Sequence, residues 1–382
     1  MKRLLLTWAT LCLTGLLALA QVPHRMVIPD VAGYKTLKGD MHIHTVFSDG
    51  SVWPTTRIDE AMMEGLDFIA ITDHMDERLQ KQKQKGLMNN DRNDSYKIAA
   101  ARGKENDVLV IHGGEITRGM PPGHFNTTFI SDGNAIAKAI DAETDDYKSM
   151  DAGLRVAREQ GGFLVWNHPH WSRQAPNGAK WYDEHTKLLK AGLMQGIEIF
   201  NQFEGVCKEA FHWAVTHGLT IVSGTDAHQP LFKWMDMTTE LRPVTLVFAK
   251  ERTEQAIHEA LLAHRTAVFA EGKVYGTKEN ILPLNEAVLT VKKANFSEKK
   301  VKVVLHNSSS IPIILTKAPG GEAYIYPTYI LLQPFGDYAF DLSMTDRDKP
   351  LDKTSIDMPF RIENFYTDAD VALLRTIRVS KK

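Results

Sequence analysis

The sequence predicts an α/β domain that closes into a barrel, followed by a small all-β domain. Short apolar runs alternate with amphipathic stretches of helical periodicity from about residue 37 to about residue 270. No glycine-rich phosphate loop follows the first run, and this favours a closed barrel over a doubly wound sheet. Beyond about residue 280 the helical pattern stops and short alternating strands follow. A length of 382 residues agrees with two domains of this kind.

Seven apolar runs, bounded by Gly or Asp, are typical of buried parallel strands. They cover residues 38–44, 67–72, 108–113, 126–130, 162–166, 196–200 and 220–223. Amphipathic stretches predict helices between them, at residues 54–64, 151–160, 181–194, 206–217 and 253–264. Pro54 suits the first position of a helix, and Gly65 and Gly218 suit the position just after one.

Short alternating runs predict the strands of the C-terminal domain. They cover residues 287–291, 300–305, 311–315, 323–325, 338–342 and 372–379. Ser, Gly, Pro and Asp separate them, as in a small β-sandwich. We therefore divide the chain into an export signal at residues 1–20, a barrel domain at 21–280 and a β-sandwich domain at 281–382.

The first 20 residues are typical of an export signal. Two basic residues precede an apolar stretch, and Ala18-Leu19-Ala20 fits the pattern of small residues at a cleavage site. A membrane anchor is the alternative, but the stretch is shorter than the ~20 clean apolar residues that a span prefers. We expect cleavage before Gln21, no stable membrane span afterwards, and a periplasmic or extracellular location.

The charge and cysteine content narrow the classes of partner. A formal net charge of −2 without a long basic run argues against binding to nucleic-acid polymers. A small anionic substrate stays compatible, because bound metal ions supply positive charge locally. Only two cysteines occur, Cys12 in the export signal and Cys207 in a predicted helix. We expect no disulfide inside the mature chain and a buried thiol at Cys207.

Residues able to bind metal lie in five separate clusters at or just beyond the ends of predicted strands. They are His42 and His44 with Asp49, His74, Glu115 with His124, His168, and Asp226 with His228. Functional side chains of barrels lie at the C-terminal ends of strands, so the clusters should meet in one cavity. Any one His at a strand end is more often structural, and it is the full set that predicts a metal centre. Imidazole and carboxylate ligands without thiolate suit Zn, Mn or Fe.

Other histidines are kept out of this set. Five lie on predicted helices and are expected to face solvent: His185, His212, His217, His258 and His264.

The order of the five clusters resembles that of the PHP family, named after polymerase and histidinol phosphatase. The motifs that make up the resemblance are His-x-His…Asp, Asp-His, Gly-Gly-Glu…His, Asn-His-Pro and Asp-x-His, and they extend over roughly residues 37–270. The resemblance implies a distorted (β/α)7 barrel, two or three divalent ions and phosphoesterase activity. It implies a first ion on His42, His44, Glu115 and Asp226, a second on Glu115, His124 and His168, and a third on Asp49, His74 and His228. The export signal and the β-rich C-terminal domain look more like the secreted phosphodiesterase-type branch.

We therefore predict an exported phosphodiesterase in which a metal-bound hydroxide attacks the phosphorus of a small phosphate ester. Arg118 is a candidate clamp for a phosphate oxygen, although a surface salt bridge fits it equally well. His170 or Asp73 is a candidate proton donor to the leaving group, and a structural role suits His170 equally. Asp73 and Glu198 are also candidates for orienting the imidazoles.

Three alternatives stay open at this point. A phosphomonoesterase acting on sugar or nucleotide phosphates would need more basic groups than Arg118 and Arg173, which are all that the motif loops offer. A metal-dependent amide hydrolase would use related chemistry. A surface binding protein on an inactive barrel would usually have lost ligands, whereas every expected position is filled here. The polar segment at residues 76–95 is either a solvated loop or a lid over the cavity.

Overall fold

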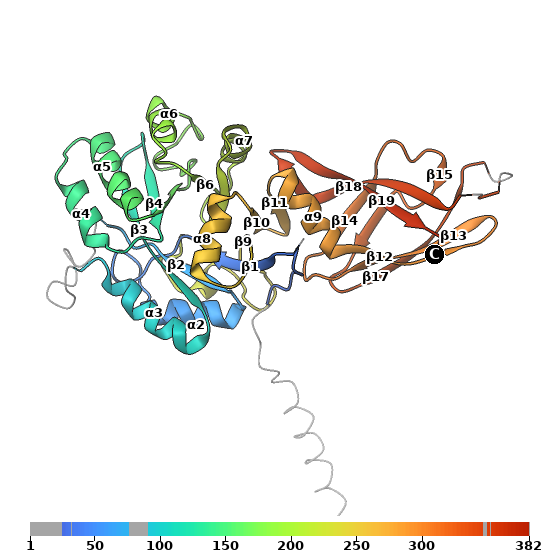
Figure 1. Ribbon diagram of the computed structural model, residues 1–382, viewed down its shortest axis with the longest axis horizontal. Coiled ribbons are helices and arrows are strands. Elements are labelled where there is room, and N and C mark those ends of the chain that lie inside the picture. Colours follow the sequence, from blue (N-terminus) through green and yellow to red (C-terminus); the bar gives the residue numbers. More distant parts are fainter. Residues whose placement is uncertain (1–24, 32, 76–90, 347–349, 352, 382) are drawn as a thin grey trace, which may run out of the picture.

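The computed structural model describes residues 25–31, 33–75, 91–346, 350–351 and 353–381. The predicted export signal and residues 76–90 of the polar segment, expected as a solvated loop or a lid, lie outside these ranges. An elongated molecule results, in which an α/β lobe continues into a narrower all-β lobe (Figure 1). Within the described part of the chain, no helix combines the length and apolarity that crossing a membrane requires.

The α/β domain consists of a curved sheet with helices packed outside it (Figure 1). Its strands are β1 (Lys35–Asp40), β2 (Phe68–Ile71), β3 (Leu109–Thr117), β4 (His124–Thr128), β5 (Phe163–Trp166), β6 (Gly196–Asn201), β7 (Gly205–Val206), β8 (Thr220–Gly224), β9 (Val244–Ala249), β10 (Thr266–Ala270) and β11 (Lys273–Tyr275). Its helices are α2 (Pro54–Glu64), α3 (Asp94–Asn106), α4 (Gly133–Asp141), α5 (Asp146–Glu159), α6 (Asp183–Lys190), α7 (Lys208–His217), the 3-10 turn η2 (Leu231–Lys233), α8 (Glu254–Leu262) and α9 (Lys278–Val288).

The strands follow the order β10-β9-β1-β2-β3-β4-β5-β6, with β8 paired to β6. Strands β1, β2 and β3 are parallel, as are β5, β6 and β8. Strand β4 instead runs antiparallel to both of its neighbours. The link at residues 118–123 is too short for the crossover that parallel strands need. The expectation of parallel strands throughout was therefore wrong at β4.

The described strands do not form the closed barrel that the sequence suggested, because no main-chain ladder joins β8 to β9 or β10. Threonine side chains make the connection instead. Thr245 Oγ1 on β9 accepts a hydrogen bond from Ser223 N at 2.9 Å, and Thr266 Oγ1 on β10 donates to Ile221 O at 2.8 Å. The sheet thus curls until its ends meet, but the ladder stays open.

Several predicted elements are confirmed with small shifts at their ends. Helix α2 begins at Pro54, and Gly65 and Gly218 end α2 and α7 with φ of 74° and 66°. Glycine adopts this left-handed conformation without the strain that a side chain would add. Cys207 is buried, as expected, and caps α7 through its sulfur. The expectation that His185 faces solvent was wrong, because its ring is buried and stacks on a tryptophan.

The C-terminal domain is a sandwich of two sheets. Its strands are β12 (Leu289–Phe296), β13 (Lys300–Asn307), β14 (Ile313–Lys317), β15 (Tyr324–Ile325), β16 (Tyr329–Leu332), β17 (Asp337–Met344), β18 (Ser355–Asp368) and β19 (Val371–Ser380). One sheet has the order β12-β13-β17-β15, and β16-β14-β18-β19 form the other. The helical pattern was expected to stop near residue 280, but α9 continues to Val288. The sequence analysis did not predict strand β18. Pro359 lies within this strand, and proline is uncommon inside strands because it lacks the backbone N–H.

The two domains share a continuous sheet. Strand β11 pairs in parallel with β18, placing Val274 beside Phe365 and Tyr275 beside Tyr366. The longest strand of the C-terminal domain therefore extends the sheet of the α/β domain (Figure 1).

A buried ion network holds the ends of β1 and β8 together. The Arg242 side chain is 2% exposed and donates to Asp40 at 2.5 Å and to Glu64 at 2.6 Å. Asp40 ends β1, and its carboxylate also accepts hydrogen bonds from the backbone and hydroxyl of Thr225 and from His42 N. One carboxylate thereby fixes the main chain just before two of the clusters described below.

Replacing Arg242 with Met should lower the free energy of unfolding by about 3–5 kcal/mol, because Asp40 and Glu64 would stay buried without their cation. Urea unfolding followed by circular dichroism measures the change. Arg378→Met is the control, because Arg378 pairs with Asp357 at the surface and its loss should leave the unfolding midpoint almost unchanged. Equal midpoints for the two variants would contradict the role given to the buried network.

Candidate metal centre

The structure brings all nine predicted metal ligands into one group at the edge of the sheet where β1, β2, β5 and β8 end. Strand β4 runs antiparallel, and therefore its first residue, His124, lies at this same edge. Donor atoms lie within 4.8 Å of one another in four overlapping sets. The sets are Glu115-His124-His168, His42-His44-Glu115, His42-His168-Asp226 and His44-Asp49-His74-His228.

These sets correspond closely to the ligand sets that the PHP resemblance implies. The second implied set, Glu115 with His124 and His168, occurs unchanged, and the third gains His44. Asp226 groups with His42 and His168, although its Oδ1 also lies 3.0 Å from His44 Nε2. Whether ions occupy these sets, and how many, stays a prediction.

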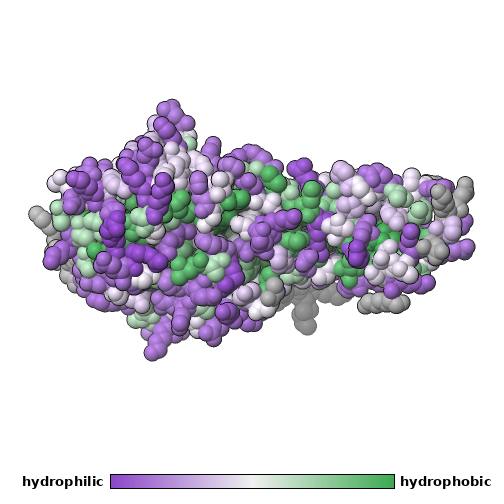
Figure 2. Space-filling model, turned by 45° about the horizontal axis from the view of Figure 1, so that its top comes forward, coloured by the Kyte–Doolittle hydropathy of each residue, from purple (hydrophilic) through white to green (hydrophobic). Residues whose placement is uncertain are grey.

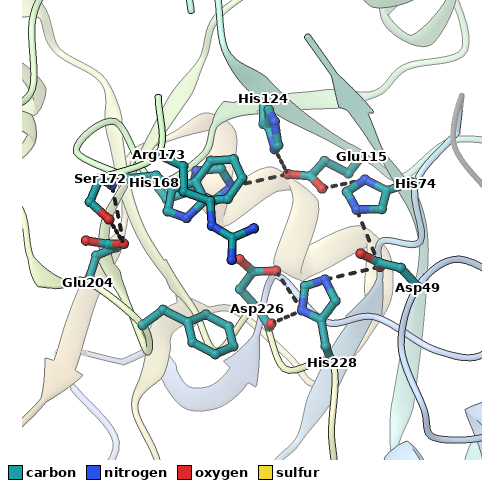
Figure 3. Close-up of a pocket in the computed structure, with 12 residues that line it drawn as sticks. Asp49, His74, Glu115, His124, His168, Ser172, Arg173, Glu204, Asp226 and His228 are labelled. Carbon is teal, nitrogen blue, oxygen red and sulfur yellow. Dashed lines mark hydrogen bonds and ion pairs between the residues drawn. The ribbon is translucent and has the colours of Figure 1, made fainter. Parts of the chain in front are cut away.

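Glu115 lies between His168, His124 and His74 (Figure 3). Its Oε1 is 3.5 Å from His42 Nε2, 3.2 Å from His124 Nδ1 and 3.4 Å from His168 Nε2. Its Oε2 is 2.9 Å from His74 Nδ1. A single carboxylate is therefore within reach of imidazoles from four segments, as a ligand shared between two ions requires.

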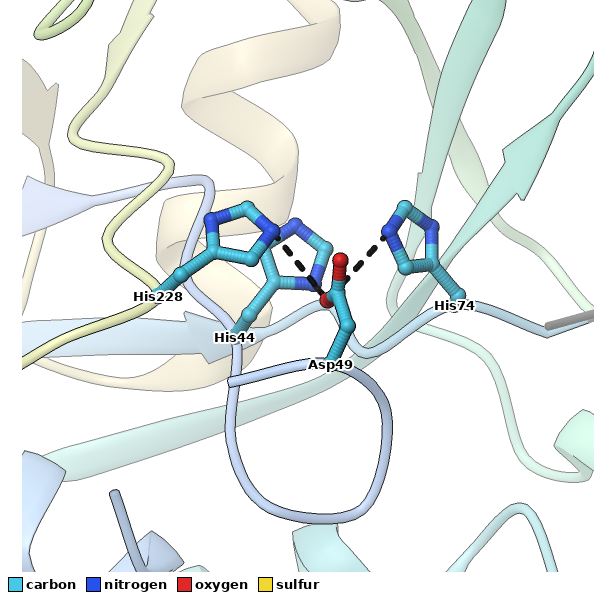
Figure 4. Close-up of side chains that lie close together, drawn as sticks. All are labelled: His44, Asp49, His74 and His228. Carbon is cyan, nitrogen blue, oxygen red and sulfur yellow. Dashed lines mark ion pairs between the residues drawn. The ribbon is translucent and has the colours of Figure 1, made fainter. Parts of the chain in front are cut away.

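Asp49 brings a second carboxylate to the group and lies between His228 and His74 (Figure 4). Its Oδ1 is 3.1 Å from His228 Nε2 and 3.5 Å from His74 Nε2. The rings of His44 and His228 stack with centroids 4.2 Å apart. Ser51 N donates to the carbonyl of His228 at 2.7 Å, which ties the loop that carries Asp49 to the loop after β8.

The charges of the group suit cations. Burial alone would raise the pKa of Glu115, but the surrounding imidazoles, that of His124 foremost, hold this pKa well below its usual value. Burial lowers the pKa of His44 to about 4, and the imidazoles of His228 and His74 act in the same direction. At neutral pH, ionised carboxylates thus face a neutral His44, whereas Asp226 and Glu115 overcome the effect of burial and raise the pKa of His42 and of His74 well above its ordinary value. Metal ligands must be deprotonated, so a bound cation would displace the protons of these two rings. The Nε2 atoms of His42 and His44 lie only 3.2 Å apart, and a shared cation would satisfy both. The donor set therefore fits divalent ions.

Buried acids behind the ligands fix the orientation of the rings. Glu198 on β6 accepts from His42 Nδ1 at 3.3 Å and from His168 N at 2.7 Å. Asp73 accepts from Ser48 Oγ at 2.6 Å, and Ser48 Oγ lies 3.3 Å from His44 Nδ1. The contacts at Nδ1 of His42 and His44 leave the Nε2 atom of each of these two rings directed at the centre.

Arg57 on α2 ties the two ligand loops together, and the sequence analysis did not identify it. Its buried guanidinium donates to the carbonyl of His44 at 3.0 Å, of Ala227 at 2.6 Å and of Gln229 at 3.0 Å. The only available signal was an arginine on the apolar face of an amphipathic helix, where burial requires several hydrogen-bond acceptors.

Two ligands have strained main-chain conformations. His168 has φ of 28° and Asp226 has φ of 52°, values that residues other than glycine seldom adopt. Their backbone amides are nevertheless bound, by Glu198 Oε2 and by the carbonyl of His42. Strain of this kind is typical of functional sites, where surrounding contacts enforce it.

The three predicted catalytic residues that are not ligands lie behind the pocket wall. Arg118 donates to Ser149 Oγ, His170 Nε2 donates to the carbonyl of Glu204 at 3.0 Å, and Asp73 binds the loop before Asp49. None of the three is among the described residues that line the pocket. The residues that do line it, besides ligands, are Trp171, Ser172, Arg173, Phe203 and Glu204. They lie on loops without a recognisable motif, and only Arg173 was mentioned from the sequence.

Comparison with solved structures identifies the family. A two-domain protein from Bacteroides vulgatus ATCC 8482, containing a predicted PHP-like metal-dependent phosphoesterase, matches with a TM-score of 0.84 and 35% sequence identity. The match covers 94% of this chain and 100% of the other. The chain therefore belongs to this PHP-like family of two-domain proteins. A sequence family described as an Ig-like domain matches residues 289–378.

More distant structures carry no argument about function. A candidate metal-dependent phosphoesterase from Bifidobacterium adolescentis ATCC 15703 matches with 14% identity and a TM-score of 0.40, over 60% of this chain and 97% of the other. An amidohydrolase from Chromobacterium violaceum matches with 17% identity and a TM-score of 0.39, over 50% and 88%. Comparison with curated proteins gave no match.

Glu198→Gln should weaken binding of Zn²⁺ or Mn²⁺ by about 10–100-fold, because a neutral amide holds the His42 ring less firmly. Calorimetric titration of the chelator-treated protein measures the affinity. Glu209→Gln on α7 is the matched control, since Glu209 is exposed and should leave the affinity unchanged. Equal affinities in the two variants would show that Glu198 does not orient the ligand.

Proposed function

We propose that this protein is an exported, metal-dependent phosphodiesterase that hydrolyses small phosphate esters. The observation that carries the proposal is Glu115, whose two carboxylate oxygens lie within 3.6 Å of five imidazoles. Two or three Zn, Mn or Fe ions are the proposed cofactors, and membership of the PHP-like family supports this chemistry. Export rests on residues 1–20 alone, and the secreted branch of the family stays part of the proposal.

The protein's own residues hold and orient the reacting groups. When bound, divalent ions acidify water and neutralise the nonbridging oxygens of a phosphate. Glu115 keeps two ligand sets at a fixed separation, and Glu198 and Asp73 prevent the imidazoles from turning away. Because both oxygens of Asp73 already accept hydrogen bonds from Thr45 or Ser48, we assign Asp73 to positioning. For His170 we adopt the structural role that the sequence left open, because its Nε2 already donates to the carbonyl of Glu204, and we assign no proton donor to the leaving group.

Arg173 takes the role of phosphate clamp in this proposal. Its guanidinium extends into the pocket toward Asp226 (Figure 3). Arg118 instead supports the wall, since its guanidinium binds Ser149 and its carbonyl accepts from Gln174. Arg173 is the single Lys or Arg among the described residues that line the pocket. A diester carries one negative charge and a monoester nearly two at neutral pH, so one cation favours the diester.

Replacing Glu115 or Asp226 with Ala should lower kcat for bis(p-nitrophenyl) phosphate at least about 100-fold, because stabilisation of the developing charge is lost. The assay is run with Zn, Mn, Fe and Mg, and with p-nitrophenyl phosphate beside the diester. Glu209→Ala controls for a surface carboxylate, and circular dichroism checks the fold. Unchanged turnover in either variant would contradict the mechanism. A wild-type protein that binds metal but hydrolyses no ester would favour the non-catalytic alternative.

Arg173→Met should lower kcat/KM for the diester by about 10–100-fold, because a charge-assisted hydrogen bond to a phosphate oxygen is lost. Steady-state kinetics on both esters measures the effect. Arg155→Met on α5 is the matched control, as Arg155 pairs only with Asp151 at the surface. A normal kcat/KM in Arg173→Met would show that Arg173 does not clamp the phosphate.

A further inference from the structure

Two aromatic side chains stand beside the metal ligands without belonging to them. The ring centroid of Trp171 lies 5.3 Å from that of His124 and 5.4 Å from that of His168. The ring of Phe203 lies 6.2 Å from that of His228. Both side chains line the pocket, so each of the two outer ligand sets has an aromatic neighbour.

The loops that carry these rings are joined into one wall. Ser172 N and Ser172 Oγ donate to Glu204 Oε1 at 3.3 and 3.1 Å (Figure 3). His170 Nε2 donates to the carbonyl of Glu204 at 3.0 Å, and Phe203 N donates to Asn201 Oδ1 at 3.0 Å. The rings are therefore held in place by neighbouring hydrogen bonds on both loops.

Phe203 is exposed at the mouth of the pocket although it is large and apolar. It is 41% exposed, and its outer side meets Trp234 edge to face at 5.0 Å. Trp234 is also 41% exposed. On the face that Figure 2 shows, apolar residues form separate patches on a mainly polar surface. Exposed apolar groups at the rim of a polar cavity are a mark of ligand binding.

The pocket is larger than a phosphate group alone requires. Its volume is about 450 Å³, within the range of sites for small organic ligands. A phosphate bound at the metal-ligand sets and beside Arg173 would leave the space next to Trp171 and Phe203 for the organic part of an ester. Aromatic side chains contact flat rings by stacking or edge-to-face packing, and saturated rings of the same bulk cannot do this equally well.

We propose that Trp171 and Phe203 bind a flat ring in the alcohol part of the substrate. The substrates are then phosphate esters of ring-bearing alcohols, whether aryl, benzylic or heteroaromatic. This assignment rests on the proposed phosphoesterase function and adds the chemical class of the ester to it.

The test compares two non-hydrolysable probes, the monomethyl esters of benzylphosphonate and of cyclohexylmethylphosphonate, each of which carries the single charge of a diester. They have the same charge and connectivity and similar bulk, and differ in whether the ring is flat and aromatic. Calorimetric titration into the Mn²⁺-loaded protein should show about threefold to tenfold tighter binding of the benzylphosphonate ester. Trp171→Leu and Phe203→Leu should each reduce this preference, and the double variant should remove it. Phe335→Leu, which removes an exposed ring from the C-terminal domain, should retain it.

Equal binding of the two probes by the wild-type protein would overturn the assignment, as would binding of neither. A preference that survives in the double variant would overturn it too. Because the readout is binding, it is independent of turnover. A protein that prefers the benzylphosphonate ester but hydrolyses no phosphate ester would refute the proposed function and leave the ring site standing.

Discussion

The buried carboxylate of Asp40 is the constraint on which the rest of the site depends. A charge without exposure to water is costly unless every lone pair finds a partner, and here Arg242 and Thr225 supply those partners. His42 follows Asp40 by two residues, and Asp226 follows Thr225 by one. The relative placement of these two ligands is therefore set by one ion network that cannot shift without exposing an unpaired charge.

The same principle recurs behind the other ligands. Arg57 donates hydrogen bonds to main-chain carbonyls of both ligand loops. Asp73 accepts hydrogen bonds from Thr45 and Ser48. Buried charged groups thus bind the backbone of the loops that carry His44, Asp49 and His228, which restricts the movement of these loops. Glu198 plays the same part after β5, where it binds the backbone amide of His168 and supports the unfavourable φ angle of that residue.

The sequence revealed the ligands because each is local to a strand end, where an apolar run stops and a short motif begins. The antiparallel sense of β4 was recoverable in principle from the short link between Thr117 and His124. The sequence does not reveal β9, β10 or the open ladder beside β8, because these features depend on pairing between residues far apart in sequence. Arg57, Trp171 and Phe203 escaped notice for a related reason, since only the folded chain shows what surrounds them.

The pairing of β11 with β18 has a mechanical consequence. At this junction the chain passes from β11 through α9 directly into β12, so no loose tether separates the lobes. The shared sheet therefore fixes the orientation of the pocket mouth relative to the Ig-like lobe. A partner bound to the Ig-like lobe would therefore also set the orientation of the pocket. The lobes could separate only if the main-chain hydrogen bonds between β11 and β18 broke.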